Sequence, residues 1–232
     1  MSSILECRDL TKDFDGHKAV CNLNLTLPEG KIVGLLGPNG SGKTTLIKMI
    51  NGLLKPTSGE LLVGGFVPGI ESKKLVSYLP ERTYLDESLH VADTLTLFQD
   101  FYEDFDMGRA EDMLQKLKIN PHDQIKTLSK GTREKVQLIL VMSRRARLYC
   151  LDEPIAGVDP AARDFIMTTI LNNYAQDATI LISTHLIADV ENILDDVIFL
   201  QNGQIRLFSP VDDIRYQQGK SLDGLFREVF KC

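Results

Sequence analysis

The hydrophobic positions in the first sixty residues predict strands followed by a helix. Residues 23–27 alternate strictly between apolar and polar, which is typical of a strand with one face in water. Residues 31–36 are almost continuously apolar, as in a strand buried inside a parallel sheet. Residues 45–54 have helical spacing, and Lys-Pro-Thr-Ser-Gly at 55–59 ends that helix. Shorter runs predict further strands at residues 4–8 and 60–63.

The middle of the chain changes to helix periodicity. Apolar side chains recur at helical spacing between residues 85 and 147, which predicts a helical subdomain. They are Leu95, Phe98, Phe101, Tyr102, Met113, Leu114 and Leu117. Strand and helix patterns alternate again at residues 148–151, 160–174, 179–183, 197–200, 204–208 and 222–230. We therefore expect one domain, residues 1–232, in which residues 1–84 and 148–232 form an α/β core with an antiparallel β-subdomain.

Charge and hydropathy narrow the functional classes. The net charge is -6, which argues against a bulk nucleic-acid binder. Ten acidic and four basic residues lie between Asp86 and Lys126, so the acidic excess is confined to one internal segment. The longest purely apolar run, residues 138–142, is far shorter than the about 20 residues of a membrane span. The amino terminus lacks a secretory pattern, so we expect any membrane role to require a separate partner chain.

The four cysteines indicate a reduced, cytoplasmic setting. No pair of them has the spacing of a metal or redox site. Cys150 lies within an apolar run, where a small buried thiol packs well.

Residues 37–44, Gly-Pro-Asn-Gly-Ser-Gly-Lys-Thr, match the phosphate-binding P-loop between a buried strand and a helix. Glycines let backbone N–H groups curl around phosphate oxygens, and the helix N-terminus adds its dipole. We expect Lys43 to reach the β- and γ-phosphates of ATP and Thr44 to bind Mg²⁺. The alternative is a glycine-rich turn with a purely structural role.

Asp152 and Glu153 follow the predicted strand 148–151. Ligands of α/β sheets bind at the carboxyl ends of strands, so both carboxylates would face a bound nucleotide. Asp152 is suited to hold Mg²⁺ and Glu153 to polarise the attacking water. A solvated strand end is the alternative, although its combination with a P-loop favours the catalytic interpretation.

With these motifs the chain resembles the ATP-binding cassette (ABC) family, and specifically the nucleotide-binding subunit of an ABC transporter. Residues 128–132, Leu-Ser-Lys-Gly-Thr, occupy the position of the family signature Leu-Ser-Gly-Gly-Gln. The resemblance implies that Ser129 and Gly131 contact the γ-phosphate of ATP held by a second subunit. Lys130 and Thr132 depart from the pattern. Ser129 also suits the N-cap of a helix, which is the structural alternative.

Three more positions follow from the resemblance. Asp159, in Gly-Val-Asp-Pro at residues 157–160, matches the D-loop, and His185 matches the switch histidine that senses the γ-phosphate. Phe14 lies where the family stacks an aromatic ring on adenine, although a core or hairpin aromatic is the alternative. The implied ATP-binding set is Phe14, Gly37, Pro38, Asn39, Gly40, Ser41, Gly42, Lys43, Thr44, Thr45, Glu81, Ser129, Lys130, Gly131 and Asp159.

Glu81 departs from the family, which has glutamine at this place after the strand leading out of the core. A carboxylate can approach Mg²⁺, so Glu81 joins Thr44 and Asp152 as an expected metal ligand. Glu81 and Lys130 together resemble a branch of exporter ATPases with Ser-Lys-Gly signatures, whose substrates are peptides, antibiotics or amphipathic molecules.

The resemblance implies an ABC ATPase fold, ATP hydrolysis with Glu153, His185 and Lys43 as catalytic residues, and a head-to-tail homo- or heterodimer. It implies a separate transmembrane permease and a peripheral location at the cytoplasmic face of the cell membrane, with no nucleic acid. The alternatives are a soluble ABC ATPase acting on nucleic acid or ribosomes, and a non-hydrolysing regulatory nucleotide binder. A small-molecule P-loop kinase would lack the signature, D-loop and switch histidine.

The acidic segment suggests a place where the permease docks. We expect Phe98, Phe101 and Tyr102 to anchor a basic cytoplasmic helix of that subunit. Carboxylates would form the rim of the contact, namely Asp100, Glu103, Asp104 and Asp106. The alternative is a solvated helical surface.

Overall fold

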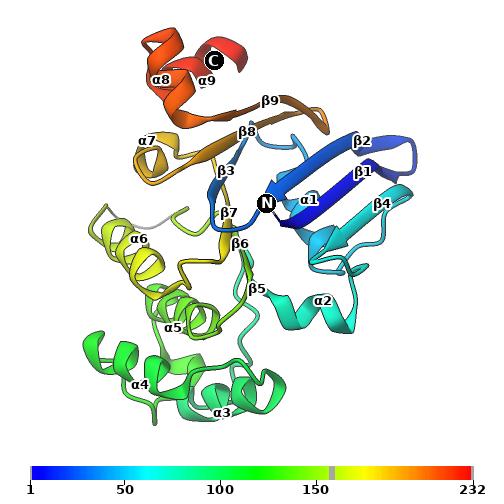
Figure 1. Cartoon of the computed structure of the whole chain (residues 1–232). Helices are drawn as coiled ribbons and strands as arrows, with labels where there is room; N and C mark the ends of the chain where they lie inside the picture. The colour runs from blue at the N-terminus through cyan, green and yellow to red at the C-terminus, as the bar shows by residue number, and fades with distance from the viewer. Residues whose placement is uncertain (1, 157–159, 231–232) are drawn as a thin grey trace.

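A computed structural model describes residues 2–156 and 160–230. Its centre is a six-stranded sheet of order β5-β6-β7-β3-β8-β9, in which only the β8–β9 pair is antiparallel (Figure 1). The strands are β3 (Ile32–Leu36), β5 (Val76–Leu79), β6 (Leu148–Asp152), β7 (Thr179–Thr184), β8 (Asp196–Gln201) and β9 (Gln204–Pro210). Every residue of β3, β6 and β7 is buried, which explains their continuously apolar sequences.

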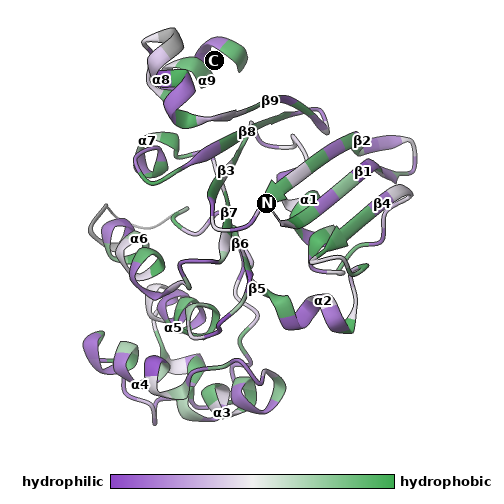
Figure 2. Ribbon diagram, viewed as in Figure 1, coloured by the Kyte–Doolittle hydropathy of each residue, from purple (hydrophilic) through white to green (hydrophobic). Residues whose placement is uncertain are grey.

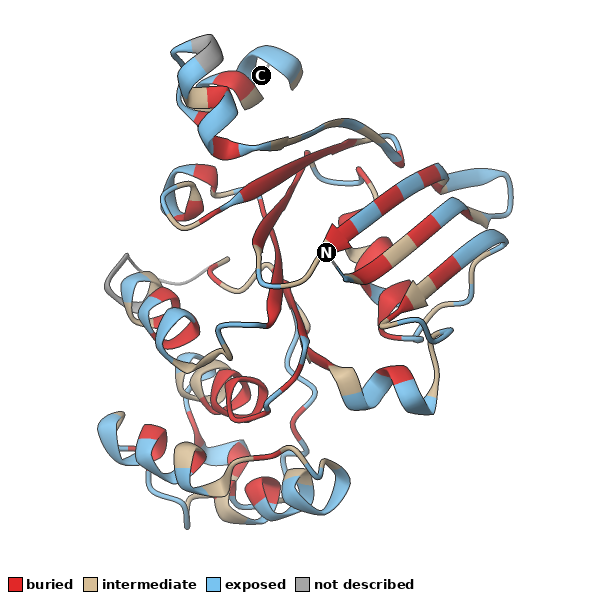
Figure 3. Ribbon diagram, viewed as in Figure 1, coloured by how far each residue is buried: buried red, intermediate tan, exposed pale blue. Residues whose placement is uncertain are grey.

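A second sheet is three-stranded and antiparallel, in the order β2-β1-β4. Its strands are β1 (Ser3–Phe14), β2 (His17–Pro28) and β4 (Ser58–Val63). Apolar and polar residues alternate along β2, and burial alternates with them (Figures 2 and 3). Helix α1 (Lys43–Ile50) packs with this sheet and with the central sheet in one shared hydrophobic cluster.

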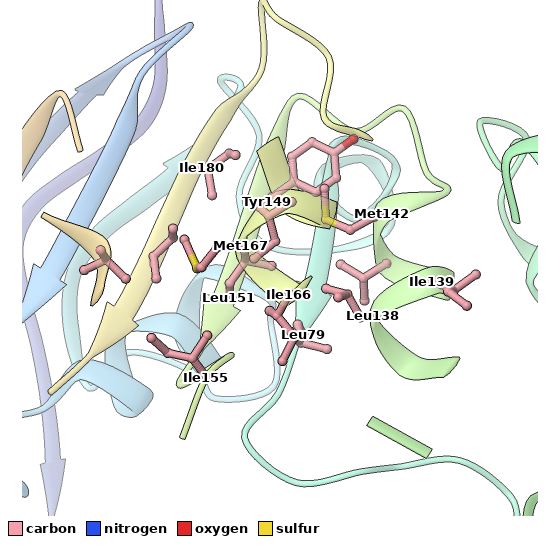
Figure 4. Close-up of a cluster of buried hydrophobic side chains, with 14 of the residues drawn as sticks. Leu79, Leu138, Ile139, Met142, Tyr149, Leu151, Ile155, Ile166, Met167 and Ile180 are labelled. Atoms are coloured by element: carbon pink, nitrogen blue, oxygen red, sulfur yellow. The ribbon is translucent and has the colours of Figure 1, made fainter. Parts of the chain in front are cut away.

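The helices of the middle segment pack around α5 (Lys130–Met142), which lies beside the central sheet. The others are α3 (Val91–Phe101), α4 (Met107–Lys116) and the 3₁₀ helix η1 (Ile125–Thr127). Figure 4 shows Leu138 and Met142 of α5 close to Tyr149 and Leu151 of β6. Helix α6 (Pro160–Asn173) adds Ile166 to the same cluster.

Several predicted boundaries are wrong. The predicted strands at residues 4–8 and 23–27 are parts of two 12-residue strands whose polar positions point to solvent. The predicted helix at residues 45–54 ends at Ile50, followed by a turn. Two short helices, α2 (Ile70–Leu75) and α8 (Val211–Gln218), were not expected. The remaining helices are α7 (Ile187–Val190) and α9 (Leu222–Phe230).

Two of the expected rim carboxylates are internal ion-pair partners instead. Asp104 accepts two hydrogen bonds from the buried Arg144 guanidinium, at 2.9 Å to Nε and 3.1 Å to Nη2. Asp106 caps α4 by accepting from the Arg109 N–H and also pairs with Arg145 at 3.1 Å. These carboxylates hold the end of α3 and the start of α4 to the end of α5, so they do not form a free acidic rim.

No helix in the described part of the chain combines the length and the apolar character that crossing a bilayer requires.

Candidate functional site

A cavity of about 490 Å³ lies where β3, β5, β6 and β7 end and α1 begins. Its lining is His17, Ala19, Asn39, Gly40, Ser41, Gly42, Lys43, Thr44, Thr45, Glu81, Glu153, Ala156 and His185. The carboxyl ends of parallel strands meet at one edge of a sheet, and this topology brings residues from distant parts of the sequence together.

Two positions in the loop at residues 37–42 require glycine, because carbonyl oxygens of neighbouring strands lie too close for a Cβ atom. A Cβ on Gly42 would lie 2.2 Å from the carbonyl oxygen of Ala19, and the φ of Gly42 is +108°. A Cβ on Gly37 would lie 2.3 Å from the carbonyl oxygen of Leu200. The loop is therefore clamped between β2 and β8, which fixes the conformation of its backbone.

Lys43 is buried at the first position of α1, and its Nζ donates to the carbonyl oxygens of Gly37 (2.7 Å) and Pro38 (3.3 Å). Burial lowers the pKa of Lys43 below its ordinary value, while the negative charges of Glu153, Asp152 and Glu81 act in the opposite direction. The ammonium group is thus held at the cavity next to three carboxylates, where a polyanionic phosphate would meet it.

Asp152 lies at the end of β6 and is 1% exposed. Its Oδ1 accepts hydrogen bonds from Thr44 Oγ1 (3.2 Å) and from Ser183 Oγ. Its Oδ2 is buried without a hydrogen-bond partner, and so is Ser41 Oγ in the loop. Because buried polar atoms are normally paired, these two groups are suited to a ligand that completes them.

Glu153 and His185 form a pair at the edge of the cavity, with 2.9 Å between Glu153 Oε2 and His185 Nδ1. Glu153 has a φ of +52°, which residues with a Cβ seldom adopt. Its backbone N–H donates to the carbonyl oxygen of Ser183, so the β6–β7 ladder holds the residue in this conformation. The side chain of Glu153 therefore projects from a fixed backbone toward the phosphate loop.

The cavity does not include every expected residue. Glu81 lines the cavity, whereas Phe14 does not. Phe14 is 42% exposed, and Lys12 Nζ lies 4.9 Å from the centroid of its ring. Asp159 lies outside the described residues.

The signature residues also lie apart from the cavity lining, at the start of α5. Ser129 is the N-cap, and its Oγ accepts from the backbone N–H of Thr132 at 3.2 Å. Lys130 pairs with Glu134 at 3.8 Å. A Cβ on Gly131 would meet no atom within 4 Å, so nothing within the described chain requires glycine there.

Sequence reasoning missed His17, Ala19 and Ala156 in the lining and the contact of Ser183 with Asp152. His17 follows the β1–β2 turn, and no local pattern marks it. Ser183 could have been suspected, because it ends an apolar strand just before His185.

Comparisons with known proteins show the family of this chain. A family model described as ABC transporter matches residues 20–156, more than half of the chain. The ABC-type transporter ATP-binding protein EcsA of Bacillus subtilis (strain 168) is 31% identical over 99% of this chain and 97% of its own length. The ABC transporter ATP-binding protein YdbJ of the same organism is 33% identical over 88% of this chain and 68% of its own length.

Solved structures show the same arrangement of elements. An ATP-binding subunit of an ABC transporter superposes with a TM-score of 0.88 at 30% identity, covering 98% of this chain and 99% of that chain. An ATP-binding cassette in its ADP conformation, 23% identical, has the same fold with a TM-score of 0.77 over 99% of both chains. The expected α/β fold with an antiparallel sheet and a helical segment is therefore confirmed. The chain belongs to the ABC transporter family, as an ATP-binding subunit and an ATPase.

Proposed function

We propose that this ATPase hydrolyses Mg²⁺-bound ATP as one half of a head-to-tail dimer and drives a separate membrane permease. The observation that carries the proposal is the convergence of Lys43, Glu153 and His185 on one cavity. A phosphate-binding cation, a carboxylate and an imidazole are the groups that in-line attack of water on a γ-phosphate requires.

The proposal includes a bound Mg²⁺ ion, and the site offers the oxygen atoms that this ion prefers as ligands. Thr44 Oγ1 and Asp152 are oxygen donors beside each other, and Asp152 Oδ2 has no partner. Glu81 would supply a third oxygen. Within the described residues no cluster of three His, Cys, Asp or Glu side chains forms a ready metal cage, so the ion would be shared with ATP phosphates. When bound, it would neutralise charge on the transferring phosphoryl group.

The roles of the side chains follow from their positions. Lys43 would hold the β- and γ-phosphates in line. Glu153 would orient the attacking water and accept its proton. His185 would hold the Glu153 carboxylate in place, with 2.9 Å between Nδ1 and Oε2, and would face the γ-phosphate. The backbone of Glu153 is anchored by β7, so this geometry requires little reorganisation.

The position of the signature supports the dimer. Ser129, Lys130 and Gly131 lie at the start of α5, outside the cavity lining of their own chain. The backbone N–H groups and the dipole at a helix N-terminus are suited to an anion. We therefore assign these residues, with Asp159, to ATP held by the second subunit, and Phe14 to the adenine.

The proposed partner is a transmembrane permease, and the proposed location is the cytoplasmic face of the membrane. The relatives EcsA and YdbJ are named as transporter ATP-binding proteins, which favours transport over action on nucleic acid or ribosomes. The presence of Glu153 and His185 favours hydrolysis over regulatory nucleotide binding. Glu81 and Lys130 support an exporter of peptides, antibiotics or amphipathic molecules.

The test is phosphate release by the purified protein at increasing protein concentration, with ATP and Mg²⁺. A dimer predicts that specific activity rises with protein concentration to a plateau and is lost when EDTA removes the metal. Addition of the permease in vesicles should raise the rate. Specific activity that is independent of concentration would contradict the dimer, and activity in EDTA would contradict the role of Mg²⁺.

A further inference from the structure

Gln137 is a buried polar side chain in an otherwise apolar stretch of α5. Residues 136–142 read Val-Gln-Leu-Ile-Leu-Val-Met, and every one of them is buried. Gln137 is 3% exposed, and its Oε1 has no hydrogen-bond partner within the described chain. A buried acceptor without a partner costs stability, and an apolar side chain of similar size would avoid that cost. What the glutamine adds at this position is therefore the contact of its other amide atom.

That atom, Gln137 Nε2, donates a hydrogen bond to the carbonyl oxygen of Pro80 at 3.3 Å. Pro80 follows the last residue of β5 and directly precedes Glu81, which lines the ATP cavity. In the part of the chain that the structure describes, this is the one side-chain hydrogen bond that reaches residues 80–83 from another element. The backbone next to Glu81 is thus tied to α5 by a single side chain.

Close packing does not hold this segment on the side that faces α5. A small cavity of about 40 Å³ lies there, and its lining includes Gln137, Pro80, Leu138, Glu81 and Glu153. It has room for about one water molecule, whose share of liquid volume is about 30 Å³. Glu81 is exposed, and its carboxylate has no hydrogen bond or ion pair within the described residues. The place of this carboxylate therefore depends on the backbone that Gln137 holds.

Glu81 is close enough to the nucleotide site to influence its charge. Burial lowers the pKa of Lys43, and the charge of Glu81 acts in the opposite direction, together with those of Glu153 and Asp152. Glu81 and Glu153 line both the small cavity and the ATP cavity, so the two cavities adjoin. A shift of the backbone at Pro80 would therefore move the Glu81 carboxylate relative to Asp152.

We propose that Gln137 is a positioning residue, which sets the place of Glu81 as a ligand of Mg²⁺ by holding the carbonyl group of Pro80. This inference rests on the proposed function, because Glu81 is assigned to the metal there. Gln137 does not line the ATP cavity, so it acts through Glu81 and contacts neither ATP nor the ion. Replacing a group that orients a metal ligand typically lowers metal affinity by about 10- to 100-fold.

The test measures binding of a non-hydrolysable ATP analogue by calorimetry, in Mg²⁺ and in EDTA. The ratio of the two Kd values is the gain in affinity from Mg²⁺. Gln137→Leu should reduce this gain about tenfold, whereas its Kd in EDTA should equal that of the unmodified protein, because the phosphate loop is untouched. Its midpoint of thermal unfolding should stay the same or rise, since leucine removes the unpaired Oε1. A purely structural role would lower that midpoint and leave the gain from Mg²⁺ as it is.

Ser77→Ala is the matched control. Ser77 Oγ donates to the carbonyl oxygen of Val141 at 2.9 Å, which is another buried side-chain hydrogen bond between β5 and α5. Ser77 lines neither the small cavity nor the ATP cavity. This variant should keep the full gain from Mg²⁺, whatever its effect on the midpoint of unfolding.

Glu81→Ala decides whether Gln137 acts through Glu81. It should reduce the gain from Mg²⁺ at least as much as Gln137→Leu, and the double variant should show no further loss. An unchanged gain in Gln137→Leu, an additional loss in the double variant, or an equal loss in Ser77→Ala would overturn the inference alone. An unmodified protein without any gain from Mg²⁺ would overturn the inference and the proposed metal site together. These measurements require neither hydrolysis nor the permease, so their outcome is separate from the phosphate-release test.

Discussion

His185 Nδ1 lies 2.9 Å from Glu153 Oε2, although the two residues are 32 positions apart in the chain. They end neighbouring parallel strands, β6 and β7, and both line the cavity that the phosphate loop closes. The pair combines a carboxylate on a left-handed backbone with an imidazole that is half exposed. This arrangement makes Glu153 the first residue to test.

Glu153→Gln should bind ATP normally and hydrolyse it about 10²- to 10⁴-fold more slowly, because the amide cannot accept the proton of water. Phosphate release and ATP affinity are measured on the same preparation. ATP should then hold two copies together, which light scattering detects. Turnover close to that of the unmodified protein would remove Glu153 from the catalytic role.

Lys43→Ala should weaken ATP binding by about 2–5 kcal/mol, which is roughly 30-fold to several thousand-fold in Kd. The buried ammonium is the positive charge that α1 presents to the cavity. Calorimetric titration with ATP measures the change. Lys55→Ala, on an exposed residue after α1, is the control and should leave Kd unaltered. Equal affinity in both variants would be incompatible with the assigned phosphate loop.

Gly131→Ala distinguishes an effect on the stability of the fold from an effect on hydrolysis by the proposed dimer. The new Cβ meets no atom within 4 Å, so the midpoint of thermal unfolding should stay the same or rise slightly. If Gly131 faces ATP on a second subunit, hydrolysis should fall about 10- to 100-fold. Gly108→Ala is a matched control, because Gly108 is also the second residue of a helix, with no atom closer than 3.6 Å. Full activity in both variants would argue against the head-to-tail contact.

Asp104→Asn should destabilise the protein by on the order of 3 kcal/mol, because it leaves the buried Arg144 guanidinium without its anion. Urea unfolding measures the free energy. Asp100→Asn removes the same charge from an exposed residue of α3 and should change stability by less than about 0.5 kcal/mol. Equal effects would mean that the ion pair contributes nothing to stability.

The buried thiols should resist alkylation. Burial raises the pKa of Cys7 and of Cys150 from 9.0 to about 12. Iodoacetamide reacts with the thiolate, so at pH 8 both should be labelled only after unfolding, as mass spectrometry shows. The unfolded state ionises these thiols near 9 and the folded state near 12. Between these values the folded state binds more protons, so stability should fall as pH rises.

The positions of several candidate site residues at the ends of strands were predictable from the sequence. The phosphate loop, Asp152 and Glu153 each lie within a few residues of a strand whose apolar run marks it. A motif of this kind depends on backbone groups close together in the chain, so its pattern survives without tertiary information. The core strands β3, β6 and β7 were predictable for the same reason, because burial on both faces requires continuous apolar sequence.

Only the tertiary structure decided which distant residues meet. Ser183 contacts Asp152, His17 lines the same cavity as Lys43, and Asp104 pairs with Arg144. These contacts arise from the packing of strands and helices. The sequence also did not reveal which charges of the acidic segment are paired, because Asp104 and Asp106 form ion pairs with Arg144 and Arg145 from outside that segment. Composition along the chain averages over every face of a helix. A binding surface is one face assembled from several elements, and its charge depends on how those elements pack.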